Sequence, residues 1–172
     1  MSKSEEKKKE KEVRKEVKRR LPLKEKEPRT AFLSSFLMLP VMVGCILSHF
    51  FGLLQLPFSE IVSWVIGGII SFTGLLVVVK WLILWGKEYQ GQLITYGVFQ
   101  YVQHPHYLGS ILLMFGLSIF FRSIVALLFS FLFVFLIAKG IEEEEKYLIK
   151  QYDNAYREYV KSVRWKLIPK VW

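Results

Sequence analysis

Residues 61–85 read IVSWVIGGIISFTGLLVVVKWLILW, and this stretch decides the fold class. It carries one charge, Lys80, close to its end. A run of about 18 or more apolar residues is long enough to cross the hydrocarbon core of a bilayer as a helix. Gly67, Ser71 and Gly74 recur at helical spacing, and such small residues let a second helix approach closely in lipid. The stretch therefore predicts a membrane-spanning helix with a packing face.

Three further apolar segments cover residues 31–51, 107–121 and 123–138. The first contains Pro40, where we expect a kink, because neighbouring helices can satisfy the backbone carbonyl that proline leaves free. The last two are short and separated only around Arg122, which predicts a tight helical hairpin. The sequence thus predicts an all-α integral membrane protein with about four transmembrane helices, the last two forming that hairpin.

Charged residues gather at the two ends of the chain. Residues 1–29 hold 13 Lys/Arg and 7 Asp/Glu, and we interpret them as a charged cytosolic tail that precedes a transmembrane domain over residues 30–172. Residues 139–159 are expected to continue the fourth helix out of the bilayer as a cytosolic helical extension. The tail lacks aromatic side chains that could stack on bases, so anionic lipid explains its charge better than nucleic acid.

The distribution of Lys and Arg predicts the orientation in the membrane. Residues 139–172 contain 8 Lys/Arg, in addition to those of the N-terminal tail, whereas the connections around 52–58 and 122 contain only Arg122. Cytosolic segments are enriched in Lys and Arg. We therefore expect a multi-pass protein with cytosolic N- and C-termini, and with the 87–106 connection on the same side.

Two polar clusters flank the expected hairpin. Residues 93–109 read LITYGVFQYVQHPHYLG and lead into its first helix, and residues 142–159 read EEEEKYLIKQYDNAYREY and follow its second. Because the two ends of a hairpin are neighbours, we expect the clusters to meet at the cytosolic side.

The residue types in these clusters suit a ligand that carries both signs of charge. Pro105 can occupy the first turn of a helix without losing a hydrogen bond, and the free N–H groups there suit a carboxylate or phosphate. Gly109 allows close approach of a ligand or a helix, and the glutamates suit ribose hydroxyls or a cation. S-adenosylmethionine has these groups, so the residues permit it without requiring it. No compact His/Cys/Glu cluster indicates a metal.

The order and spacing of the clusters resemble the isoprenylcysteine carboxyl methyltransferase and phospholipid methyltransferase-like family of integral membrane methyltransferases. Its members show a pattern like Val-Arg-His-Pro-x-Tyr-Leu-Gly, then a helical hairpin, then Glu-Glu-x-x-Leu and a series of tyrosines. This chain has VQHPHYLG at residues 102–109, EEKYL at 144–148 and further tyrosines up to 159. The resemblance covers residues 60–170, with the signature within 93–159.

The resemblance implies an enzyme that transfers a methyl group from S-adenosylmethionine to a lipophilic acceptor entering from the bilayer. A prenylcysteine carboxylate, a phospholipid amine and a small lipophilic thiol or acid all remain possible acceptors. By position, the implied cofactor site comprises Leu93, Gly97, Tyr101, His104, Tyr107, Leu108, Gly109, Glu144 and Glu145. Gln103 and Tyr156 are expected substrate-contacting or accessory residues. No catalytic base is assigned, because a carboxylate or thiolate acceptor needs none.

Two alternatives differ in class. Membrane sterol reductases that use NADPH end with a similar acidic helix and tyrosine pattern, although no Gly-x-Gly-x-x-Gly fingerprint occurs in this chain. The second alternative is a non-catalytic membrane scaffold. It is considered because Gln103 replaces the family's Arg, which removes a fixed charge and bidentate hydrogen bonding.

Overall fold

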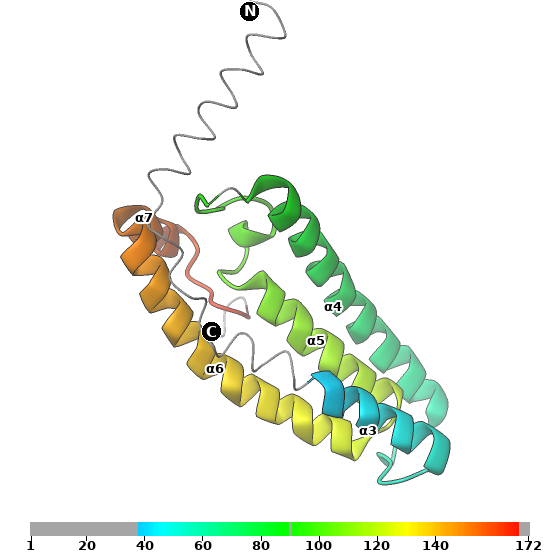
Figure 1. Cartoon of the computed structure of the whole chain (residues 1–172). Coiled ribbons are helices and arrows are strands. Elements are labelled where there is room, and N and C mark those ends of the chain that lie inside the picture. Colours follow the sequence, from blue (N-terminus) through cyan, green and yellow to red (C-terminus); the bar gives the residue numbers. More distant parts are fainter. Residues whose placement is uncertain (1–37, 90, 169–172) are drawn as a thin grey trace, which may run out of the picture.

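The computed structural model describes residues 38–89 and 91–168, and within them the regular elements are helices, with one isolated bridge between Gln55 and Ser123. The predicted all-α fold class is confirmed for this part of the chain (Figure 1). The charged tail expected at residues 1–29 lies outside the described residues, as does the part of the first expected span before Met38.

In the described part of the chain, two helices are long and apolar enough to cross a membrane: α4, Glu60–Glu88, and α6, Ile124–Tyr152. Ser59 caps the start of α4, where its hydroxyl accepts a hydrogen bond from the backbone N–H of Val62 at 3.4 Å. The first described helix, α3 (Met38–Phe51), and the helix before α6, α5 (Pro105–Phe120), are apolar but shorter. A count of four spans therefore stays a prediction.

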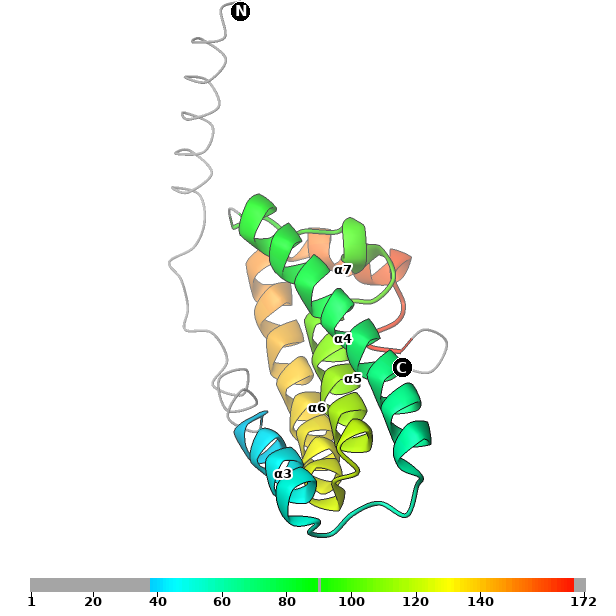
Figure 2. The same cartoon turned by 90° about the vertical axis from the view of Figure 1, so that its right-hand side faces the viewer.

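The helices run side by side, with α4 along α5, α5 beside α6, and α3 against the first half of α6 (Figures 1 and 2). A short turn at 121–123 joins α5 to α6, and Arg122 adopts a positive φ of 55° there. The α3–α4 connection is tied to this turn, because the N–H of Leu56 donates to the Arg122 carbonyl at 2.7 Å. One end of the molecule is thus closed by backbone hydrogen bonds.

Glycines bring α4 and α5 into backbone contact. A Cβ added at Gly67 would collide with the backbone of Phe120, and one added at Gly116 would collide with that of Ser71. A Cβ at Gly74 would lie 2.5 Å from the backbone nitrogen of Leu113. The packing face predicted from small residues at helical spacing is therefore the face of α4 that contacts α5.

The expected helical extension over residues 139–159 is wrong in one respect, because the helix is not continuous. It ends at Tyr152, and a separate helix α7, Asn154–Ser162, follows. Asp153 joins them with a positive φ of 40°, a conformation in which Asp and Asn are found more often than most residues. The break lets α7 fold back over the 91–104 connection, which includes the short helix η1, Gly97–Gln100.

Buried side chains form two clusters. The larger lies between α3, α5 and α6 and includes Met114, Phe133 and Ile137, and the smaller joins Tyr156, Tyr159 and Val163 to the connection before α5. The outward faces of α3, α4 and α6 expose many large apolar side chains. Such surface is unusual in contact with water and suits contact with lipid.

Candidate functional site

Three segments meet at the end of the bundle that carries α7. They are the start of α5, the second half of α6, and residues 163–167, which follow α7 and run back between the other two (Figure 1). Backbone hydrogen bonds hold the third segment in place: the N–H of Gln103 donates to the Trp165 carbonyl at 2.9 Å, and that of His104 donates to the Lys166 carbonyl at 3.0 Å.

His104 lies at the centre of this arrangement. It caps the start of α5, its side chain is 2% exposed, and Pro105 occupies the first position of the helix as expected. Its Nδ1 is 3.7 Å from Oε2 of Glu144, and its Nε2 is 3.9 Å from Oε1 of Glu145. Both distances exceed the usual range for a hydrogen bond. The imidazole therefore lies near both carboxylates, at distances longer than a hydrogen bond.

Several polar atoms here are buried and, among the described residues, lack a hydrogen-bond partner: His104 Nε2, Glu145 Oε1, Gln103 Oε1 and the Tyr156 hydroxyl. Leaving a buried polar group unsatisfied costs about 1–3 kcal/mol. Native proteins avoid this, and such groups cluster where a ligand, ion or water completes the site. The atoms of His104 and Glu145 face each other, so one bound group can reach both.

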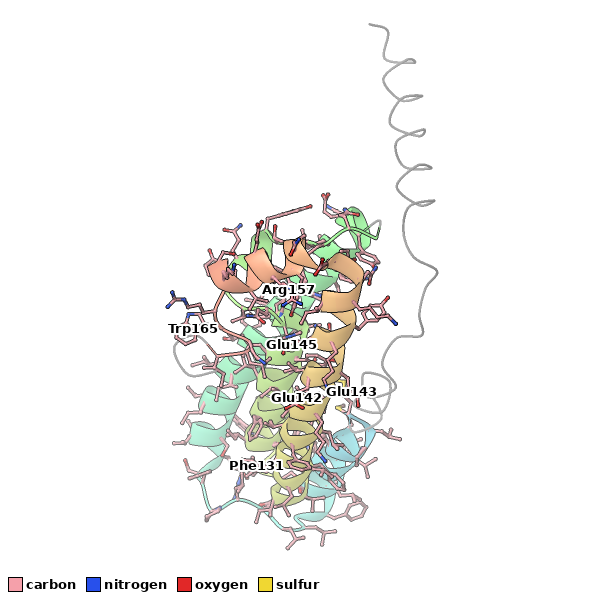
Figure 3. The ribbon with its side chains drawn as sticks, turned by 90° about the vertical axis from the view of Figure 1, so that its left-hand side faces the viewer. Phe131, Glu142, Glu143, Glu145, Arg157 and Trp165 are labelled. Carbon is pink, nitrogen blue, oxygen red and sulfur yellow. The ribbon has the colours of Figure 1, made fainter. Side chains whose placement is uncertain are left out.

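Lys166 completes the surroundings of Glu145. Its ammonium donates to Oε2 of Glu145 at 2.8 Å, which leaves Oε1 as the unpartnered oxygen. Figure 3 shows Glu145 in the half of α6 nearer Trp165 and Arg157, whereas Phe131 lies toward the opposite end. Lys166 was not predicted from the sequence, because a single basic residue near the end of the chain forms no pattern. Only the backbone pairing of residues 165–166 with 103–104 brings it to the site.

Tyr156 contributes a hydroxyl from α7. Its side chain is 2% exposed, and burial together with the charges of Glu145 and Glu144 raises the pKa of Tyr156 above its ordinary value. The hydroxyl is therefore neutral at physiological pH and can donate a hydrogen bond.

Gln103, expected as a substrate-contacting or accessory residue, holds the C-terminal segment in place, because its side-chain amide donates to the Val163 carbonyl at 2.7 Å.

The other residues proposed for the cofactor site divide into two groups. Tyr107 is buried beside His104, with 5.9 Å between the ring centroids, and it contacts Glu144. Tyr101 is 71% exposed and Gly97 lies against the side chain of Leu84. The structure thus brings Tyr107 to the cluster and leaves Tyr101 and Gly97 outside it.

Three more of these residues contact other parts of the bundle. Gly109 approaches α4, because a Cβ there would lie 2.8 Å from Val78. Of the two uses expected for this glycine, approach to a helix is the one observed. Leu93 packs against the Tyr156–Tyr159 cluster, and Leu108 packs against the larger core.

The fold and the cluster together define a class: a helical protein with helices of membrane-spanning length and an incompletely satisfied His–Glu cluster at one end of its bundle. Residues 47–155, which include His104, Glu144 and Glu145, match the phospholipid methyltransferase family. The chain belongs to this family, and the resemblance drawn from the two motifs is confirmed.

One relative gives a second comparison. A protein-S-isoprenylcysteine O-methyltransferase of Dictyostelium discoideum is 32% identical to the chain over 78 residues, which cover 45% of this chain and 32% of that protein. The match therefore spans about a third of the length of this curated relative. The family match thus stands beside two helices that, by length and composition, could cross a membrane.

Proposed function

We propose that this protein transfers a methyl group from S-adenosylmethionine to a lipophilic acceptor at the cytosolic face of a membrane. Membership of the phospholipid methyltransferase family supports methyl transfer. One observation carries the choice of site: His104 Nε2 and Glu145 Oε1 are buried, lie 3.9 Å apart, and have no hydrogen-bond partner among the described residues. Both residues also belong to the family signature. Two such groups facing each other suit a ligand that satisfies both.

The donors and acceptors of the cluster fit the cofactor. Glu145 Oε1 can accept from a ribose hydroxyl or an ammonium, the neutral Tyr156 hydroxyl can donate, and His104 Nε2 can do either according to its tautomer. Glu144, which approaches the other ring nitrogen of His104, adds negative charge that favours a cationic ligand. When bound, S-adenosylmethionine would supply an electrophilic methyl group on a positively charged sulfur.

The contribution of the chain to such a reaction is positioning. An in-line displacement depends on holding two reacting atoms in line and in contact. His104 is suited to this task, because it is almost fully buried and its backbone is tied both to α5 and to Lys166. The carboxylates of Glu144 and Glu145 would attract the positive charge of the cofactor and so help to orient it. We assign no general base.

The proposed topology has α3, α4, α5 and α6 crossing the membrane, with α5 and α6 as a hairpin and both termini cytosolic. The exposed apolar faces of the helices support it, as does the gathering of Lys and Arg in the segments outside them. In this arrangement the His–Glu cluster lies at the inner leaflet, and a lipophilic acceptor can reach it from the bilayer.

Calorimetry on the full chain purified in detergent tests the cofactor. We expect S-adenosylhomocysteine to release or absorb heat in a saturable titration and NADPH to give none. Saturable binding of NADPH alone would support the reductase alternative instead. Binding of neither would support a non-catalytic scaffold.

The acceptor class needs a second experiment. Membranes containing the protein, incubated with methyl-labelled S-adenosylmethionine, should pass label into an organic extract, and chromatography then separates prenylcysteine esters, methylated phospholipids and small thioethers. Membranes with Glu145→Gln in place of the native chain provide the background. Label confined to the aqueous phase would contradict a lipophilic acceptor.

A further inference from the structure

Lys166 lies outside both family-like motifs, yet it forms a hydrogen bond with a residue of the proposed site. Its ammonium donates to Glu145 Oε2 at 2.8 Å, across 21 residues of sequence. The lysine side chain is 33% exposed and that of Glu145 is 19% exposed. The pair thus lies between solvent and the buried imidazole of His104.

The backbone of Lys166 is held in place on both sides of the residue. The Lys166 carbonyl accepts from the His104 N–H at 3.0 Å, and the next residue, Leu167, is buried in the main core. Three residues earlier, the Val163 carbonyl accepts from the side chain of Gln103 at 2.7 Å. A lysine side chain is normally mobile, and anchoring its backbone on both sides restricts where the ammonium can lie.

The two oxygens of Glu145 have different surroundings. Oε2 accepts from Lys166, whereas Oε1 is buried, has no partner in the part of the chain that the structure describes, and lies 3.9 Å from His104 Nε2. Because one oxygen is held at the solvent side, the carboxylate plane is fixed and the other oxygen is directed at the imidazole.

We propose that Lys166 is a positioning residue for the cofactor site: it holds the Glu145 carboxylate in place, so that Oε1 is presented to the bound ligand beside His104. This inference rests on the proposed function, because it assigns Lys166 a role in that same site. It adds a residue from the C-terminal segment to a site otherwise built from the two motifs.

A purely structural role makes a different prediction. If the pair only tied the C-terminal segment to α6, its loss would lower the melting temperature and affect ligand binding no more than other destabilising changes. Partly exposed ion pairs contribute little to stability, and the backbone bonds of residues 165–166 would remain. Measuring ligand affinity together with melting temperature therefore distinguishes a positioning role from a purely structural one.

The test measures S-adenosylhomocysteine affinity by calorimetry, with melting temperature alongside, for Lys166→Met, Lys166→Arg and the control Lys161→Met. Lys161 is exposed on α7 and lies outside the cluster. We expect Lys166→Met to weaken binding about tenfold, as for the loss of one charged hydrogen bond. Lys166→Arg should restore most of the affinity, and the control should match the native chain. Should Lys166→Met not purify folded, Lys166→Gln takes its place.

A double variant shows whether Lys166 acts through Glu145. In a Glu145→Gln background, Lys166→Met should weaken binding no further, because the carboxylate it orients is gone. Native-like affinity in Lys166→Met, or additive losses in the double variant, would overturn the inference while leaving the proposed function intact. Failure of the native chain to bind S-adenosylhomocysteine would instead overturn the proposed function.

Discussion

At the scale of single residues, the charge of Glu145 is the feature on which ligand binding most depends. Glu145→Gln keeps the shape of the side chain but removes the charge from an oxygen that has no partner in the described structure. We expect S-adenosylhomocysteine affinity to fall at least about tenfold, as for one charged hydrogen bond, with little change in melting temperature. Glu142→Gln, on an exposed position of the same helix, is the matched control. Equal affinity in the two variants would remove Glu145 from the site.

Two tyrosines of α7 provide a contrast in the same region. Tyr159 donates to the Phe99 carbonyl at 2.8 Å, whereas the hydroxyl of Tyr156 has no protein partner among the described residues. Tyr159→Phe should therefore lower the free energy of unfolding by about 0.5–1.5 kcal/mol and leave ligand affinity nearly unchanged.

Tyr156→Phe should behave in the opposite way, with native or higher melting temperature and weaker S-adenosylhomocysteine binding, because none of the described residues satisfies its buried hydroxyl. Thermal melts in detergent and calorimetry on both variants check the pair. A Tyr156→Phe protein that melts earlier and binds normally would mean that the hydroxyl serves the fold.

The sequence predicted the residues of the cluster that belong to motifs, and it missed the one that does not. His104, Glu144 and Glu145 are recognisable because their spacing is that of the family, and they do meet. Lys166 reaches them through backbone pairing between distant segments, which leaves no local pattern. Tyr101 matched by position but is exposed, since position in a motif does not determine the direction of a side chain.

At the scale of elements, the contact between α4 and α5 depends on glycine at specific positions. A Cβ at Gly67 would collide with the backbone of Phe120, whereas a Cβ at the adjacent Gly68 would meet only the Phe120 ring at ordinary distance. We expect Gly67→Ala to destabilise the protein by about 1–3 kcal/mol, the usual cost of overpacking, and Gly68→Ala to be tolerated. Melting temperatures in detergent check this, and equal melting of the two variants would contradict the observed helix contact.

Elements were predictable where one physical property determines them. The length of the apolar run at residues 61–85 predicted α4 almost to its ends. This works because a helix in lipid must satisfy all its backbone hydrogen bonds internally and therefore continues through the apolar run. The break at Asp153 was not predictable from helical periodicity, because Tyr152, Tyr156 and Tyr159 lie at i, i+4 and i+7 and so continue a helical pattern across it. Tyr152 before the break and Tyr159 after it both donate to carbonyls of the 91–104 connection, so the break coincides with tertiary contacts that helical periodicity does not encode.

At the scale of the whole molecule, orientation in the membrane is the main prediction. Single cysteines at Thr95 and Phe58, both exposed, report on opposite ends of the bundle once the buried Cys45 is replaced by alanine. The proposed topology predicts that a membrane-impermeant maleimide labels position 58 from outside intact cells and position 95 only in inverted vesicles. Labelling of both positions from one side would contradict it.

The proposed site places a nucleoside cofactor in contact with His104, Glu145 and Tyr156. An experimental structure of the full chain with S-adenosylhomocysteine bound tests it most directly. We predict ligand density in contact with His104 Nε2 and Glu145 Oε1, two buried atoms that have no hydrogen-bond partner among the described residues. Ligand bound elsewhere on the protein, with these two atoms still facing each other unpartnered, would contradict the claim.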